Sequence, residues 1–188
     1  MKHLPFPDKK YGIIYADPPW SYSDKGCNGA AEAQYPCMKI DEICALPVKD
    51  IAAPDSVLFL WATYPMLREA LKTIEAWGFT YKSIAFQWVK VNRSGGGFFY
   101  GLGRWTRGNT EPCLLATKGK PSRVSNSVSQ LIFSPIQQHS KKPDETRNRI
   151  IQLMGGDHPR IELFARDSAE DWDVWGNELK VNPWEVIK

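Results

Sequence analysis

The chain has 188 residues, enough for one compact domain with a sizeable core, and we expect a single domain over residues 1–188. Hydrophobic residues at 43% and charged residues at 24% are ordinary for a globular protein and exclude a disordered or repetitive chain. The net charge of +3 by itself predicts no polyanionic partner.

The first half of the chain alternates apolar runs with a helical pattern. Residues 13–16 favour a strand, and the two prolines that come after Asp17 end it in a loop. Residues 56–62 are apolar almost throughout, as in a central strand covered on both faces. Apolar residues at helical spacing over 67–77 predict a helix that ends at Gly78.

The second half continues this alternation. We expect strands at residues 82–91, 111–117, 130–133 and 160–165, and an edge strand at 172–176. A helix is expected over 143–154, with a proline at its start and Gly155 at its end. Residues 92–109 form a long loop, and such loops are commonly functional or disordered. Strands that alternate with helices predict an α/β fold, a Rossmann-like doubly wound sheet.

Basic residues concentrate in the middle of the chain. Between Gln87 and Lys142 there are nine basic residues and one acid, Glu111, so this stretch carries +8 and the remainder −5. The nine are Lys90, Arg93, Arg104, Arg107, Lys118, Lys120, Arg123, Lys141 and Lys142. A basic region on an acidic body is typical of a nucleic-acid-binding protein, and a solvated basic surface without a partner gives the same pattern.

Cysteines, histidines and the N-terminus point away from metal and membrane. The four cysteines form no C-x-x-C pair and the three histidines complete no zinc pattern, so we expect no metal. No segment resembles a signal peptide or is apolar enough to cross a bilayer. We expect a soluble cytoplasmic protein with reduced thiols and no membrane contact.

The most specific motif is Asp17-Pro18-Pro19-Trp20. It comes directly after the first predicted strand, and ligands of open α/β sheets bind beyond the carboxyl ends of the strands. Pro19 holds Pro18 extended, so the Pro18 carbonyl and the Asp17 carboxylate form two fixed acceptors for a flat amine. Trp20 offers a ring for stacking. The motif predicts a pocket for an exocyclic amino group, although the bare tetrapeptide out of context better fits an ordinary turn with a core tryptophan.

Lys142 stands directly before Pro143, at the expected N-terminus of a helix. A cation there is unfavourable unless an anion is bound nearby. Lysine and exposed backbone N–H groups would hold a carboxylate. An exposed lysine without a ligand explains the position equally well.

Glycines, aromatic residues and cations interleave in the loop at 92–109. Its candidate substrate contacts are Arg93, Arg104, Trp105, Arg107 and Asn109. On a glycine hinge, this composition suits phosphate contacts and stacking on unpaired bases. A second loop, residues 21–35, includes Tyr35 and is expected to close over the target. Flexible surface would also explain both loops.

Taken in order, these residues resemble the MT-A70 family of S-adenosylmethionine-dependent adenine N6-methyltransferases, in its compact prokaryotic or phage form. The resemblance spans nearly the whole chain and is carried by YGIIYADPPW at 11–20, VLFLW at 57–61, WG at 77–78, VK at 89–90, GK at 119–120, HSKKPDE at 139–145, RIELFAR at 160–166 and WGNEL at 175–179. It implies methyl transfer to the N6 amine of adenine in nucleic acid, with DNA favoured over RNA, from S-adenosylmethionine as cofactor.

The resemblance also implies roles for individual residues. The catalytic residues would be Asp17, Pro18, Pro19 and Trp20. The cofactor would contact Asp17, Lys142, Phe164, Arg166, Asn177 and Glu178, with Lys142 on its carboxylate and Asn177 and Glu178 on its ribose. The substrate would contact Trp20, Tyr35, Arg93, Arg104, Trp105, Arg107 and Asn109.

Three departures from the family pattern bear on the cofactor site. Relatives often have Gln in place of Glu178 and His in place of Ser168, and both departures bear on the ribose contacts. Relatives also have more chain ahead of the first strand, with an acidic residue that contacts the cofactor's adenine, than the sixteen residues that precede Asp17 here. We therefore expect the adenine site to be open or completed differently.

Two other functions fit the same features. One is a catalytically silent partner subunit that keeps only the nucleic-acid surface, and the other is a methyltransferase for amines of protein side chains. Because 188 residues leave no room for a separate target-recognition domain, we expect modest sequence selectivity or a second subunit, either another copy or a different chain.

Overall fold

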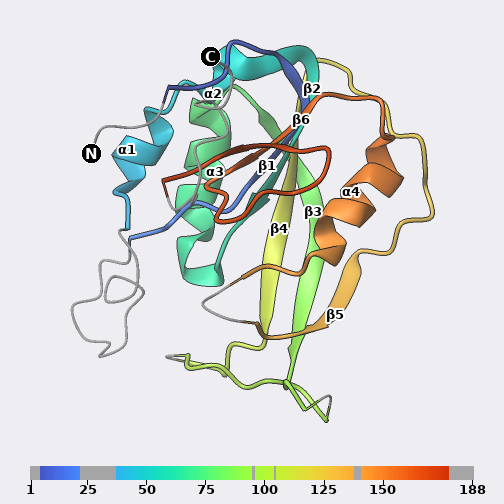
Figure 1. Cartoon of the computed structure of the whole chain (residues 1–188). Helices are drawn as coiled ribbons and strands as arrows, with labels where there is room; N and C mark the ends of the chain where they lie inside the picture. Colours follow the sequence, from blue (N-terminus) through green and yellow to red (C-terminus); the bar gives the residue numbers. More distant parts are fainter. Residues whose placement is uncertain (1–4, 22–36, 95, 104, 138–140, 178–188) are drawn as a thin grey trace.

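A computed structural model of the chain describes residues 5–21, 37–94, 96–103, 105–137 and 141–177 (Figure 1). The strands are β1 (Tyr11–Ala16), β2 (Ala52–Trp61), β3 (Thr80–Val91), β4 (Thr110–Lys118), β5 (Leu131–Pro135), β6 (Arg160–Leu163) and β7 (Asp173–Trp175). The helices are α1 (Ile40–Cys44), α2 (Val48–Ile51), α3 (Leu67–Ala76), which follows a 3-10 turn at Tyr64–Met66, and α4 (Glu145–Met154).

The strands form one seven-stranded sheet in the order β5-β3-β4-β2-β1-β6-β7. Strand β4 runs antiparallel to both of its neighbours, and the other four pairs are parallel. Carboxyl ends of β1, β2, β3 and β6 therefore meet at one edge of the sheet, and the start of β4 lies at that same edge. The predicted α/β fold is confirmed.

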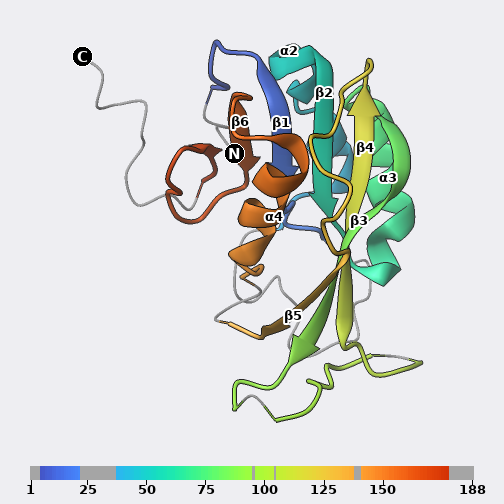
Figure 2. The same cartoon turned by 90° about the vertical axis from the view of Figure 1, so that its right-hand side faces the viewer.

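Helices cover both faces of the sheet, with α1, α2 and α3 on one side and α4 on the other (Figures 1 and 2). Strand β1 shows the division residue by residue. Ile14 and Ala16 pack in the cluster that contains residues of α1 to α3, whereas Ile13 and Tyr15 pack with Ile150 of α4. A strand buried on both faces cannot alternate apolar and polar residues, which is why β1 and residues 57–61 of β2 are continuous apolar runs.

Several element boundaries differ from the sequence expectation. Helices α1 and α2, of five and four residues, were not predicted, because so few residues show no helical periodicity. Strand β2 begins at Ala52 instead of residue 56, and α4 begins at Glu145 instead of Pro143. Strand β6 ends at Leu163, two residues early, because Phe164 has a φ of 62° and leaves the extended conformation.

The segment at 92–109 continues the β3–β4 pair as a hairpin that projects beyond the sheet (Figure 2). Backbone hydrogen bonds join Phe99 N–H to the Lys90 carbonyl and Gly101 N–H to the Gly108 carbonyl at 2.9 and 3.0 Å. A Cβ on Gly101 would lie 2.6 Å from the Gly108 oxygen, so glycine is needed there for close approach of two backbones. At Gly101, where a glycine hinge was expected, the structure has two backbone segments in close contact, joined by an isolated antiparallel bridge.

Candidate active site

Strand β1 delivers Asp17 to the carboxyl edge of the sheet. Asp17 directly follows Ala16, the last residue of β1, and its N–H lies 3.5 Å from the carbonyl oxygen of Leu163 at the end of β6. Its side chain keeps 27% of its surface exposed, in contrast to the fully buried residues before it. Asp17 is thus the point at which a buried strand reaches accessible surface.

Four charged side chains of alternating sign meet at this edge. Lys142 Nζ lies 3.0 Å from Asp17 Oδ1 and 2.9 Å from Glu111 Oε1, and Lys90 Nζ lies 2.9 Å from Glu111 Oε2. The side chains of Lys142 and Glu111 are only 8% and 6% exposed. Buried charges are tolerated when they are paired, and these four neutralise one another.

The ion pairs set the protonation of each member. Burial raises the pKa of Glu111, but the ammonium groups of Lys142 and Lys90 outweigh it, so that pKa lies below its usual value. For Asp17, burial raises the pKa, Lys142 only partly offsets this, and the Glu111 carboxylate raises it further. Burial lowers the pKa of Lys142, yet Asp17 and Glu111 together raise it above its usual value. The ion pairs therefore favour the charged forms of Glu111 and Lys142, whereas burial disfavours the charged form of Asp17.

Trp61, the last residue of β2, connects the charges to the motif. Its ring lies beneath Lys142 Nζ, 5.6 Å from the ring centroid, a cation–π distance. Its indole N–H donates to the Tyr15 hydroxyl at 2.6 Å, and its carbonyl accepts from the Trp20 indole at 3.2 Å. Trp61 is fully buried, so it fixes both partners from inside the core.

The structure folds the proline motif into a tight turn. Trp20 N–H donates to the Pro18 carbonyl at 2.9 Å, which occupies one of its two lone pairs and leaves one for a ligand. Pro19 accepts from Met38 N–H at 2.9 Å. Trp20 itself is 5% exposed and packs with Met38 in the core. The ring predicted to stack on the substrate therefore presents little surface in this structure.

Phe164, Arg166 and Asn177, three of the residues predicted to hold the cofactor, follow β6 and β7 in the chain, whereas Asp17 and Lys142 belong to the ion-pair network. Phe164 contacts the edge of Trp175, with ring centroids 5.5 Å apart at 78°. A Cβ on Gly176 would overlap the carbonyl oxygen of Ala165, so a glycine lets the two segments lie in contact. Arg166 lies close enough to Asp17 to lower the pKa of its carboxyl. Asn177 is exposed at the end of the described segment, and Glu178 lies outside the described residues.

The residues predicted to hold the substrate are spread more widely. Arg93 donates to the carbonyls of Ile136 and Gln137 at 3.3 and 3.1 Å, so it fastens the hairpin to the segment after β5. Trp105 and Arg107 are exposed on the hairpin, Trp105 to 94%, and Asn109 is half-buried at its base. The structure therefore does not bring these residues into one cluster with Asp17. Tyr35 and Arg104 lie outside the described residues.

Sequence reasoning missed Glu111, Lys90 and Trp61 as members of the site. Glu111 was counted only as the one acid in a basic stretch, and Lys90 as one of nine cations. A lone carboxylate at the start of a strand, among so many cations, was the available signal, since a buried acid requires cationic partners.

The MT-A70 family model matches residues 11–178. This chain belongs to the MT-A70 family. The match confirms the predicted family and the predicted activity, that of an adenine N6-methyltransferase.

The chain is similar to several curated proteins, among them three methyltransferases. It is 36% identical to the type II methyltransferase M.MunI of a Mycoplasma species, covering 96% of this chain and 82% of that protein. It is 32% identical to a putative N(6)-adenosine-methyltransferase MT-A70-like protein of Medicago truncatula, and spans 26% of its length. It is 27% identical to mouse N(6)-adenine-specific methyltransferase METTL4, and spans 38% of its length.

Two further features concern what the described part of the chain lacks. Among the described residues, no three His, Cys, Asp or Glu side chains lie close enough together to hold a metal ion. No helix formed by those residues is both long and apolar enough to cross a bilayer.

Cys113, which faces Asp17 from β4, is fully buried, and burial raises the pKa of its thiol well above the usual value. A buried, protonated thiol is unsuited to act as a nucleophile.

Proposed function

We propose that this chain transfers a methyl group from S-adenosylmethionine to the N6 amine of adenine in DNA. The observation that carries the proposal is the Asp17 carboxylate, held at the open edge of the sheet by buried Lys142 and placed one residue from the Pro18 carbonyl. This arrangement supplies two rigid acceptors, which is what an exocyclic amine with two hydrogens requires.

The two acceptors act on the nucleophile. The lone pair of the adenine amine is delocalised into the ring, and hydrogen bonds to both hydrogens favour the pyramidal nitrogen that develops during attack. Asp17 Oδ1 pairs with Lys142, so Oδ2 can accept a hydrogen bond from one amine hydrogen. The second lone pair of the Pro18 carbonyl oxygen accepts the hydrogen bond from the other. Stabilisation that is stronger in the transition state than in the ground state raises the rate.

Residues beyond β6 and β7 suit a nucleoside cofactor. When bound, S-adenosylmethionine would supply an electrophilic methyl carbon: the N–C bond would form as the C–S bond breaks, S-adenosylhomocysteine would leave, and the methylated nitrogen would lose one proton to solvent. The close contact at Gly176 brings Arg166 and Asn177 to the edge that carries Asp17, and their donors and acceptors match ribose hydroxyls. We also assign Phe164 and Glu178 to this site.

We propose two roles for Lys142, contact with the cofactor and control of the Asp17 carboxylate. We retain it as a ligand of the methionyl carboxylate, but two protein carboxylates already share its charge. We therefore expect its main effect to be on Asp17, which it keeps ionised and oriented.

The exposed hairpin supplies the nucleic-acid contact in this proposal. Phe98, Tyr100 and Trp105 are 47%, 65% and 94% exposed and lie close in sequence to Arg107, a combination that suits bases and phosphates of an unpaired strand. We assign Arg93, Arg104, Asn109 and Tyr35 to the same interface. An adenine in a duplex must be flipped out, at a cost of a few kcal/mol, so single-stranded or distorted DNA is the better substrate.

We favour DNA over RNA as the substrate because the chain covers different shares of its relatives. The protein named a type II methyltransferase matches over 82% of its length, whereas the Medicago protein named for adenosine matches over 26% of its length. The complete Asp17, Lys142 and Glu111 network speaks against a catalytically silent subunit.

The test is methyl transfer from labelled S-adenosylmethionine to single-stranded DNA, duplex DNA and RNA in parallel, followed by nucleoside analysis. We expect N6-methyladenine, with single-stranded DNA labelled fastest. Asp41→Ala is a control, because Asp41 is an exposed acid paired only with Lys72 among the described contacts. Label on protein alone, or no label with any polymer at millimolar cofactor, would overturn the proposal.

A further inference from the structure

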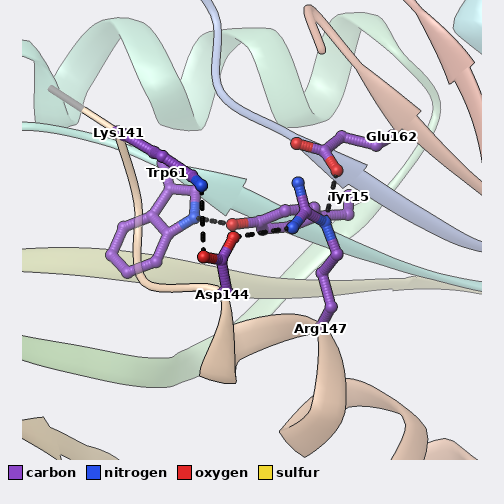
Figure 3. Close-up of polar contacts among 6 residues, drawn as sticks. All are labelled: Tyr15, Trp61, Lys141, Asp144, Arg147 and Glu162. Atoms are coloured by element: carbon purple, nitrogen blue, oxygen red, sulfur yellow. Dashed lines mark hydrogen bonds and ion pairs between the residues drawn. The ribbon is translucent and has the colours of Figure 1, made fainter. Parts of the chain in front are cut away.

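A second chain of charges connects strand β6 to the turn that carries Lys142 (Figure 3). Arg147, in the first turn of α4, places Nε 2.6 Å from Glu162 Oε2 on β6 and one terminal nitrogen 3.0 Å from Asp144 Oδ1. Asp144 Oδ2 in turn lies 3.1 Å from Lys141 Nζ. The chain therefore ends at the neighbour of Lys142 in sequence.

The Arg147–Glu162 pair is the buried part of this chain. Side chains of Arg147 and Glu162 are 20% and 12% exposed, whereas Lys141 and Asp144 are 39% and 56% exposed. Exposed pairs contribute little, and a buried pair contributes no more stability than well-packed apolar residues would. A buried pair does, however, fix geometry, because its short hydrogen bonds admit few arrangements.

The same pair lies against the aromatic residues beneath Lys142. Tyr15 is the neighbour of Glu162 in the β1–β6 register, and its ring lies between Arg147 and Trp61 in Figure 3. The Tyr15 hydroxyl accepts the indole N–H of Trp61, whose ring faces Lys142. The pair thus reaches Lys142 by two routes, through the turn at 141–144 and through the two rings.

We propose that Arg147 is a positioning residue: by holding Glu162 and Asp144 together, it fixes the turn at 141–144 so that Lys142 contacts both Asp17 and Glu111. The consequence for methyl transfer rests on the proposed function. The consequence for the charge state of Asp17 does not, and can be measured in the protein alone.

Arg149 provides a matched control on the same helix. It pairs with Glu145 at 2.5 Å, donates to the carbonyls of Ser129 and Leu131 at 2.6 and 2.7 Å, and is 17% exposed. It therefore resembles Arg147 in chemistry and burial, with three described partners where Arg147 has two. Its contacts to Ser129 and Leu131, however, fasten α4 toward β5, and its third partner, Glu145, lies on α4 itself.

The experiment compares Arg147→Met with Arg149→Met in the full chain. The readouts are unfolding by urea, titration of the Asp17 carboxyl by carbon NMR with Asp17→Asn for assignment, and single-turnover methyl transfer. The charged and titratable groups that face Asp17 are Lys142, Glu111, Arg166, Cys113, Tyr15 and Glu162, and neither single variant substitutes any of them. We expect both variants to lose stability.

Only Arg147→Met is expected to change the site. Its Asp17 pKa should rise by on the order of one unit, and its turnover should fall roughly tenfold, because a displaced Lys142 no longer favours the carboxylate. Arg147→Lys, which cannot hold both acids in the same fork, should give a smaller rise. If Arg147→Met does not fold, Arg147→Met with Glu162→Gln removes both buried charges. Because the Glu162 carboxylate also acts on Asp17, the Asp17 pKa of this double variant is compared with that of Glu162→Gln alone and should lie above it.

An Asp17 titration in Arg147→Met that matches the wild-type protein, or that matches Arg149→Met, would overturn the positioning role. If the titration shifts as expected but the wild-type protein methylates no nucleic acid, the positioning role stands and the proposed function fails.

Discussion

The carboxyl edge of the sheet and the β3–β4 hairpin carry the two halves of the proposed function in opposite physical settings. At the edge, Lys142 and Glu111 are nearly buried and each has at least two ionic or aromatic partners. On the hairpin, Trp105 is 94% exposed and Arg107 is also exposed. One region holds a few charges rigidly, and the other presents rings and cations to solvent.

The two regions are therefore expected to control different kinetic quantities. A low-dielectric site strengthens each electrostatic interaction, so a changed charge at the edge alters the transition state and kcat. Exposed groups contribute through stacking and counterion release, which alter binding and its salt dependence. If variants of the carboxyl edge and of the hairpin both changed kcat, or both changed only DNA binding, this division of roles would be wrong.

The largest effect is expected from Asp17→Ala. Loss of an acceptor for the target amine should lower kcat by at least roughly 10²- to 10³-fold, while DNA binding stays near that of the wild-type protein. Because Asp17 is partly exposed and its pKa is raised by burial, its removal should not destabilise the fold. Single-turnover rates and thermal unfolding measure both. Near wild-type turnover would remove Asp17 from the reaction.

Lys142→Met is expected to rank second. It leaves Asp17 and Glu111 without their shared cation, so unfolding free energy at neutral pH should fall by about 3–5 kcal/mol. Because Lys142 lowers the pKa of Asp17, the acidic limb of the pH–rate profile should move to higher pH. Lys72→Met is the control: loss of its exposed pair with Asp41 should change stability little and leave the profile in place.

Glu111→Gln is expected to move the pH–rate profile in the opposite direction to Lys142→Met. The Glu111 carboxylate raises the pKa of Asp17, so its neutralisation should shift the acidic limb to lower pH. The pKa of Glu111 itself is lowered by folding, so its stabilising contribution is present above pH 4.5 and is lost as the pH falls through the folded-state value. The stability difference from the wild-type protein should therefore shrink on acidification. A difference that grows in acid would contradict the ion-pair assignment.

Much of the edge was predictable from sequence, and the reason is geometric. The apolar run before Asp17 requires a buried strand, and a parallel sheet places the residues after such a strand at the ligand-binding edge. The pairing of Glu111 with Lys142 was not predictable, because it depends on strand direction. Only an antiparallel β4 puts its first residues, Glu111 among them, at the edge where β1 and β2 end.

The hairpin shows the opposite limit of sequence reasoning. Its composition indicated a nucleic-acid surface, but glycine content indicated a flexible hinge where the structure has close backbone contacts at Gly101 and Gly108. Glycine serves close approach and flexibility equally, and only the partner backbone distinguishes them. The role of Trp20 was similarly open, because one sequence position does not show whether a ring faces the core or a ligand.

The smallest effect on catalysis is expected from Trp105→Ala and Arg107→Ala on the hairpin. Loss of one stacking ring should weaken single-stranded DNA binding by about 1–3 kcal/mol, and loss of Arg107 should reduce the salt dependence by about one phosphate contact. Stability should change by less than about 0.5 kcal/mol, because neither side chain is packed. Binding isotherms at several salt concentrations and saturating-DNA turnover measure the two sides of the comparison. Since kcat depends on the buried charges, it should hold at saturating DNA, and a fall in kcat or in cofactor affinity would show that the hairpin reaches the reaction centre.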